Sequence, residues 1–262
     1  MGYGWHLYAA VVAAGFAAGF INILAGSGSL ITLPLLIFLG LPATVANGTN
    51  RVAILLQNTV AVSSFRFQNT LDWRGGLALA APATLGALLG ARIAVGLDNM
   101  MMERVIGALM VAMIGVMLAQ PRRWMQTVLS EPQPAYPVGR MLTFFAIGVY
   151  GGFIQAGVGI FLLVGLVLSG QYDLIRGNAV KALIVLCFTA VALPVFIANG
   201  QVNWVIGLTL ALGNASGAWV GAHIAVARGT AFVRWVLLGV LLLSAAKLLG
   251  VFDAIGDFHG SS

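Results

Sequence analysis

The sequence predicts an all-α integral membrane protein with two inverted-topology repeats, each made of a broken helical element followed by three spanning helices. Apolar residues make up 60% of its 262 residues and charged residues only 8%. Several apolar runs reach the roughly 20 residues that a helix needs to cross a bilayer. Two stretches in corresponding places, 19–34 and 152–160, interrupt such runs with glycine and polar residues.

The charge and cysteine content narrow the class of protein further. The net charge of +6 is small and scattered along the chain. Such charges are typical of residues that set the orientation of loops in a membrane, and no nucleic-acid partner is expected. Cys187 is alone, so an intramolecular disulfide is excluded. Because no Lys or Arg precedes the first apolar run, we expect no cleaved signal peptide, and that run is expected to stay as the first helix.

The first half of the chain is predicted to contain five helical segments. They are expected at 7–25, 29–39, 44–65, 75–96 and 101–119. The second segment has only 11 residues, which at about 1.5 Å each crosses part of a bilayer. We therefore expect the first two segments to form one bent or hairpin element around Gly26-Ser27-Gly28-Ser29.

A polar segment separates the two halves. Residues 121–139 carry four prolines together with Arg122, Arg123 and Glu131, a composition that cannot stay in lipid. The predicted organisation is a first transmembrane repeat at 1–120, a cytoplasmic linker at 121–139, a second transmembrane repeat at 140–252 and a polar tail at 253–262.

The second half repeats the first at a distance of 131 positions (204 − 73). Under this shift, 73–95 falls on 204–226 with 12 of 23 residues identical. The second-half elements are therefore expected at 141–169 (broken), 175–197, 204–226 and 231–249. Both copies keep G-x-x-x-G, at Gly86 and Gly90 and at Gly217 and Gly221, which favours close packing of helices.

Basic residues predict opposite orientations for the two halves. Arg66 and Arg74 flank the turn after the third segment, whereas the corresponding turn at 198–203 has no charge. Conversely, the turn at 97–104 contains acidic as well as basic residues, while its counterpart in the second half has Arg228 and Arg234 and no acidic residue. Under the positive-inside rule the halves are inverted, the linker is cytoplasmic and both termini are periplasmic.

The position of charged residues predicts the sign of a bound solute. All seven acidic residues are expected in turns, the linker or the tail: Asp72, Asp98, Glu103, Glu131, Asp173, Asp253 and Asp257. A carrier of metal cations is therefore disfavoured, although backbone carbonyls can bind sodium. Arg51 and Lys181, by contrast, enter predicted spans, where each would cost on the order of 3 kcal/mol without a partner.

A small oxyanion site is predicted where the broken elements meet. Helix N-termini present free N–H groups and favour anions, and Asn22 and Gln155 are expected to face each other. The candidate substrate-binding residues are Asn22, Gly26, Ser27, Gly28, Ser29, Thr32, Asn47, Thr49, Asn50, Arg51, Gln155, Gly157, Gly159, Asn178 and Lys181. A purely structural interpretation is also open, in which the two cations extend to lipid headgroups, the amides cap helices and the glycines serve packing.

The motifs resemble those of a known family. The stretch G-F-I-N-I-L-A-G-S-G-S-L-I-T-L-P (19–34), A-N-G-T-N (46–50) and G-G-F-I-Q-A-G-V-G (151–159) are similar to the sulfite exporter TauE/SafE family of bacterial membrane proteins. The resemblance extends from about Phe16 to Leu249. Matching positions are Asn22, Gly26, Gly28, Pro34, Asn47, Thr49, Gln155, Gly157 and Gly159. Ala179-Val180 stands where the first copy has Thr49-Asn50, which argues against a strictly symmetric site.

This resemblance implies transport of a small anion across the bacterial inner membrane, such as sulfite or an organosulfonate like sulfoacetate, in the direction of export. Together with the inverted repeats it predicts a secondary transporter that works by alternating access. A passive anion channel is the alternative. No enzyme is expected, because His6, His223 and His259 are far apart in the sequence and no metal or cofactor motif occurs. The anion, the driving force and the oligomeric state are left open.

Overall fold

The computed structural model describes residues 5–119, 138–168 and 172–248, and within these ranges all regular structure is helical. The helices are α1 (Trp5–Ala25), α2 (Ser29–Phe38), α3 (Ala43–Phe67), α4 (Trp73–Val95), α5 (Asn99–Ala119), α6 (Val138–Phe153), α7 (Val158–Leu168), α8 (Leu174–Ala198) and α9 (Trp204–Leu248). The prediction of an all-α protein is confirmed.

The predicted elements lie close to the observed ones. Both breaks are present, between α1 and α2 and between α6 and α7. The predicted helices at 204–226 and 231–249 correspond to the two parts of α9, which meet at Gly229 with a non-helical φ of 74°. Helix α6 begins at Val138, so the end of the predicted linker is helical. The remainder of that linker and the tail at 253–262 lie outside the described residues.

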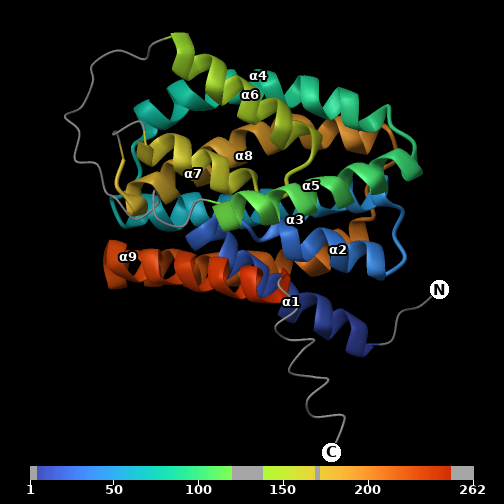
Figure 1. The fold of residues 1–262 in the computed structure, drawn as a ribbon, viewed down its shortest axis with the longest axis horizontal. Helices are drawn as coiled ribbons and strands as arrows, with labels where there is room; N and C mark the ends of the chain where they lie inside the picture. The colour runs from blue at the N-terminus through green and yellow to red at the C-terminus, as the bar shows by residue number, and fades with distance from the viewer. Residues whose placement is uncertain (1–4, 120–137, 169–171, 249–262) are drawn as a thin grey trace, which may run out of the picture.

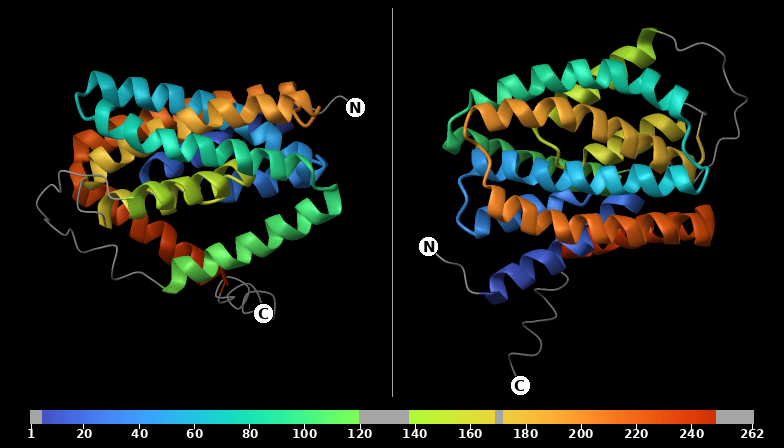
Figure 2. Two further views of the ribbon diagram at one scale, coloured as in Figure 1. Left: turned by 90° about the horizontal axis from the view of Figure 1, so that it is seen from above. Right: turned by 180° about the vertical axis from the view of Figure 1, so that it is seen from behind.

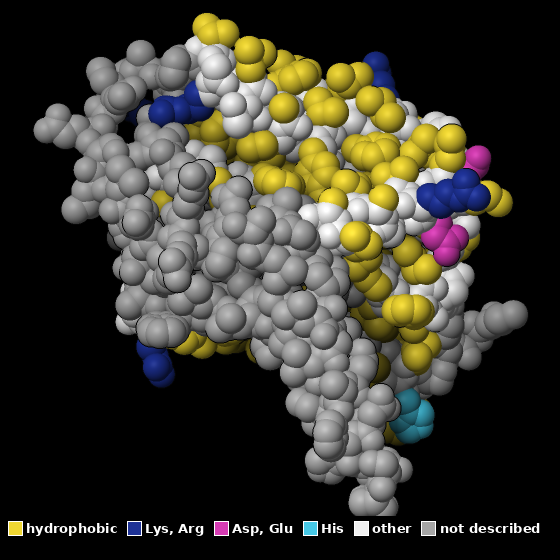
Figure 3. Space-filling model, in the orientation of Figure 1, with side chains coloured by type: hydrophobic (Ala, Val, Ile, Leu, Met, Phe, Trp, Pro, Cys, Tyr) yellow, Lys and Arg dark blue, Asp and Glu magenta, His cyan; other side chains and the backbone are white. Residues whose placement is uncertain are grey.

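The described helices have the composition and surface of a membrane protein. Four of them are long and apolar enough to cross a bilayer, namely α1, α4, α8 and the first part of α9. Large apolar side chains such as Leu85 and Leu212 are about two-thirds exposed, on α4 and α9. Figure 3 shows hydrophobic side chains across the upper part of one face, with the visible acidic and basic side chains toward its edges. Such a surface is stable against lipid and not against water.

The helices lie side by side in layers, and the two halves of the chain interleave (Figures 1 and 2). Helix α1 packs along α9, and α6 packs along α4. Helices α3 and α8 contact each other and also pack against α9 and α4, respectively. Each broken element is therefore supported mainly by a long helix from the opposite half.

Glycines set the distance between these paired helices. A Cβ atom added at Gly86 or Gly90 would lie 2.1 or 2.0 Å from a backbone carbonyl oxygen of α6. At Gly217 it would lie 2.0 Å from the carbonyl oxygen of Phe16 on α1. The backbones are thus in direct contact, and the predicted packing role of these glycines is confirmed.

We expect Gly217→Ala to destabilise the protein by about 1–3 kcal/mol, because the new methyl group would force α9 away from α1. Gly107→Ala on α5 is the matched control, since a Cβ there meets no atom within 4 Å. Thermal unfolding of both variants in the same detergent measures the difference. Equal unfolding temperatures would show that the α1–α9 contact tolerates a wider spacing.

Candidate functional site

The two breaks meet inside the molecule. Gly26 and Gly157 adopt φ values of 76° and 69°, in the left-handed region where glycine ends a helix without strain. A Cβ at Gly26 would lie 2.3 Å from the carbonyl carbon of Gly159, and one at Gly159 would lie 2.6 Å from the Cα of Gly26. The backbones of the two breaks are therefore in van der Waals contact.

Breaking a helix leaves carbonyl groups without partners, and Arg51 binds those at the end of α6. Its Nη1 donates to the carbonyl of Gly151 at 3.1 Å, and its Nη2 donates to those of Gly152 and Phe153 at 2.6 and 3.3 Å. The amide of Asn47 also donates to the Phe153 carbonyl, at 2.9 Å. The last four carbonyls of a helix have no intrahelical partner and carry partial negative charge, so this cation fits them.

Lys181 binds the carbonyl groups at the end of α1. Its Nζ donates to the carbonyls of Asn22 and Ile23, both at 2.9 Å, and to Oδ1 of Asn178 at 2.6 Å. The Asn178 amide in turn donates to the Leu24 carbonyl at 3.4 Å. A cation and an asparagine on α3 thus hold the end of α6, while a cation and an asparagine on α8 hold the end of α1.

Both cations are buried without an acidic partner. Arg51 is fully buried and Lys181 is 2% exposed, so neither extends to lipid headgroups. The four acidic residues in the described ranges lie at helix ends or on the surface, where Asp72, Asp98 and Asp173 accept bonds from backbone N–H groups of α4, α5 and α8. Carbonyl dipoles solvate the two charges but do not neutralise them. The centre of the described bundle therefore carries excess positive charge.

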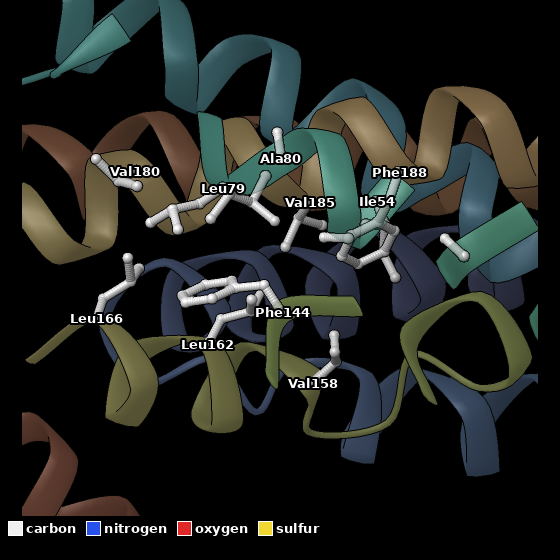
Figure 4. Close-up of a cluster of buried hydrophobic side chains, with 13 residues drawn as sticks. Ile54, Leu79, Ala80, Phe144, Val158, Leu162, Leu166, Val180, Val185 and Phe188 are labelled. Carbon is white, nitrogen blue, oxygen red and sulfur yellow. The ribbon is translucent and has the colours of Figure 1, made fainter. Parts of the chain in front are cut away.

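A small pocket opens beside the meeting point of the breaks. Its lining consists of Asn22, Ser29, Ile54, Asn58, Gln155, Val158, Gly159, Lys181 and Val185, and its volume of about 10 Å³ has room for about one water molecule. One wall is polar. The apolar lining residues Ile54, Val158 and Val185 belong to a buried apolar cluster that also includes Phe144 and Phe188 (Figure 4).

The structure brings together one group of the candidate substrate-binding residues. Asn22, Ser29, Gln155, Gly159 and Lys181 all line this pocket. Gln155 is 2% exposed; its Nε2 donates to Thr189 at 2.6 Å, whereas its Oε1 accepts no hydrogen bond from the part of the chain that the structure describes. Asn22 and Gln155, which are expected to face each other, both line this pocket.

The other candidates make contacts around the pocket. The Asn22 side chain accepts from the Gly28 N–H, as a capping role requires. Thr32 donates to Asn50, and Thr49 accepts from the Asn203 N–H. Ser27 and Gly157 are buried in the breaks.

Asn47 and Asn178 lie close to the predicted starts of their helices, at 44 and 175, where free N–H groups could bind an anion, but the geometry does not leave such groups free beside them. Helix α3 begins at Ala43, and the Ala46 N–H already bonds to the Pro42 carbonyl. The corresponding bond in α8 joins Gly177 to Asp173. N–H groups beyond these residues are consumed inside the helices, so they are not free for an anion.

Sequence reasoning missed Asn58 as a pocket residue. Its Nδ2 donates to the Ile54 carbonyl one turn earlier in α3, at 2.8 Å. Gln57 does bond between helices, accepting from Asn214 of α9 at 3.2 Å. A signal was present, because 54 and 58 on α3 are four residues apart and so share a helix face, as do 181 and 185 on α8.

We expect Arg51→Met to lower the free energy of unfolding by about 1.5–3 kcal/mol, because it leaves the last carbonyls of α6 without a charged donor. Arg66→Met is the control, since Arg66 is exposed on the last turn of α3, and a change within about 0.5 kcal/mol is expected. Thermal unfolding in detergent reports both. If the two variants unfold alike, Arg51 does not stabilise the end of α6.

An all-helical chain with apolar spans, an apolar outer surface and broken helices that meet at buried cations belongs to the class of multi-pass membrane proteins. The particular family follows from comparison with known sequences. The chain belongs to the sulfite exporter TauE/SafE family, whose model matches residues 11–248. This result confirms the resemblance found in the motifs.

Individual relatives cover nearly the whole chain. A probable membrane transporter protein from Sinorhizobium, ORF9, is 28% identical, with 94% of this chain and 93% of the relative aligned. A probable membrane transporter protein from Haemophilus influenzae is 25% identical over 99% of this chain and its own full length. The Escherichia coli probable membrane transporter protein YfcA is 24% identical over 92% of this chain and 88% of its own. No solved structure matches the chain. The family and these names point to a membrane transporter and not to an enzyme.

Proposed function

We propose that the protein is a secondary transporter that moves a small oxyanion across the bacterial inner membrane by alternating access, in the direction of export. The proposed substrates are sulfite, an organosulfonate such as sulfoacetate, or a related sulfur-containing or organic anion. The family's description as sulfite exporters supports the substrate class. The pocket between the two breaks is the proposed binding site, and it must widen from its volume of about 10 Å³ to admit an oxyanion.

The observation that carries this proposal is the pair of buried cations without a carboxylate among the described residues near them. Arg51 and Lys181 leave excess positive charge at the level where α1 and α6 end. In a medium of low dielectric constant, such a charge attracts an anion and repels a metal cation. Amides and a hydroxyl from Asn22, Ser29 and Gln155 can complete the coordination of an oxyanion.

The pairing of helices supports the proposal of two inverted repeats. Helix α1 packs on α9 as α6 packs on α4, and the cation of each half binds the broken helix of the other. Transporters of inverted-repeat design bind substrate where discontinuous helices meet. Direct backbone contacts at Gly19 and Gly152 provide smooth surfaces on which one half can rock against the other.

Two further parts of the proposal concern topology and carrier action. We place the linker at 121–139 in the cytoplasm and both termini in the periplasm, on the distribution of basic residues. A pocket with room for about one water favours a carrier over an open channel, because a conducting pore needs a continuous water-filled path.

Counterflow in proteoliposomes tests transport. Vesicles loaded with unlabelled sulfite should take up labelled sulfite transiently above its external concentration, and the initial rate should saturate. Empty liposomes are the control. Conductance without counterflow would instead establish a passive anion channel, and neither signal with any small oxyanion would remove the proposed function.

We expect Gln155→Glu to reduce anion uptake at least tenfold, because a carboxylate in the pocket would neutralise Lys181 and repel the substrate. The substitution nearly preserves shape, so the fold should persist. Gln201→Glu is the control, because Gln201 lies in the turn before α9, outside the pocket lining. If Gln155→Glu transports at the wild-type rate, the pocket is not the binding site.

A further inference from the structure

The hydrogen bonds of Lys181 are complete. An ammonium group has three N–H donors, and the Nζ of Lys181 makes three bonds, to the carbonyls of Asn22 and Ile23 and to Oδ1 of Asn178. Lys181 also lines the pocket. An anion that enters the pocket therefore finds a cation with no unused donor, and it can bind Lys181 only by replacing one of these three acceptors.

The replacement is favourable for electrostatic reasons. Hydrogen bonds between an ammonium group and an anionic oxygen are roughly twice as strong as those between neutral groups. The carbonyls of Asn22 and Ile23 are neutral and hold only the partial charge of a helix C-terminus. A full negative charge at the same distance from Nζ attracts the ammonium group more strongly than either carbonyl does.

Arg51 differs from Lys181 in three respects. Its guanidinium lies 4.3 Å from the ring centre of Phe196, a cation–π contact that adds to its bonds with α6. It is absent from the lining of the pocket. It also keeps a donor, Nε, that has no partner among the described residues. Arg51 therefore has no need to release the end of α6 when an anion occupies the pocket.

We propose that Lys181 is an anion-sensitive latch: an anion in the pocket draws its ammonium group from the carbonyls of Asn22 and Ile23, and so frees the end of α1 from α8. The proposal rests on the anion transport proposed above. Arg51 keeps α6 in place throughout. Anion occupancy then loosens one broken element and not the other, which couples binding to movement of α1 and α2. Lys181 acts here as a positioning residue as well as a contact for the anion.

Hydrogen–deuterium exchange of the full-length protein in lipid nanodiscs tests the latch. Peptides covering 20–30 report on the α1–α2 break, and peptides covering 148–160 report on the α6–α7 break. Sodium sulfite is the probe, with sodium chloride at equal ionic strength as the control, and sulfite binding is measured separately by thermal shift. On adding sulfite we expect exchange in 20–30 to rise roughly tenfold, which corresponds to about 1.4 kcal/mol of lost protection, while exchange in 148–160 does not rise.

Two variants separate the latch from a purely structural role. Lys181→Gln should exchange rapidly in 20–30 without sulfite and should not respond to it, because a neutral amide cannot replace the charged cap. Lys181→Arg should restore slow exchange and the response to sulfite, because it keeps the charge.

The possible failures can be told apart. If sulfite binds the wild-type protein and exchange in 20–30 falls or stays constant, the latch is wrong and the transport proposal stands. Equal increases at both breaks would also overturn the latch, because they would show that Arg51 responds in the same way. If neither sulfite nor any other small oxyanion binds, the latch and the proposed function fail together.

Discussion

The structure depends on how two interrupted helices are stabilised inside a bilayer. Lipid offers no hydrogen bonds, so carbonyls at the ends of α1 and α6 must find donors within the protein. Lys181 and Arg51 supply them, each from a long helix of the opposite half. The same arrangement solvates two charges that could not otherwise remain in a low-dielectric interior. The breaks and the cations therefore stabilise each other.

This dependence links the fold to the proposed chemistry. The carbonyl groups at the ends of α1 and α6 are bound by cations and not by neutral donors alone. Positive charge therefore remains at the level where these two helices end. The two breaks touch at Gly26 and Gly159, so the helix ends that the two cations bind lie in the same part of the molecule. A structural requirement of broken helices thus produces the electrostatic condition for binding an anion.

Much of the fold could be predicted from the sequence, because length, apolar runs and glycine positions are local signals. The breaks at 26–28 and 154–157 follow from Gly26 and Gly157, which adopt positive φ. The partners of Arg51 and Lys181 could not be predicted. Those partners are backbone carbonyls, which every residue has, and they lie about 100 and 158 positions away in the chain. Their selection depends on tertiary packing, so the sequence identified the cations but not the groups they bind.

The contact between Gly26 and Gly159 constrains any route through the molecule. The two backbones leave no space even for a methyl group, so a solute cannot cross between them while they touch. In the proposed transport the route would therefore run to one side of this contact, where Asn58 and Val185 line the pocket. Residues on the side of the contact away from the pocket would then be free to differ between the two halves, because the solute would never meet them.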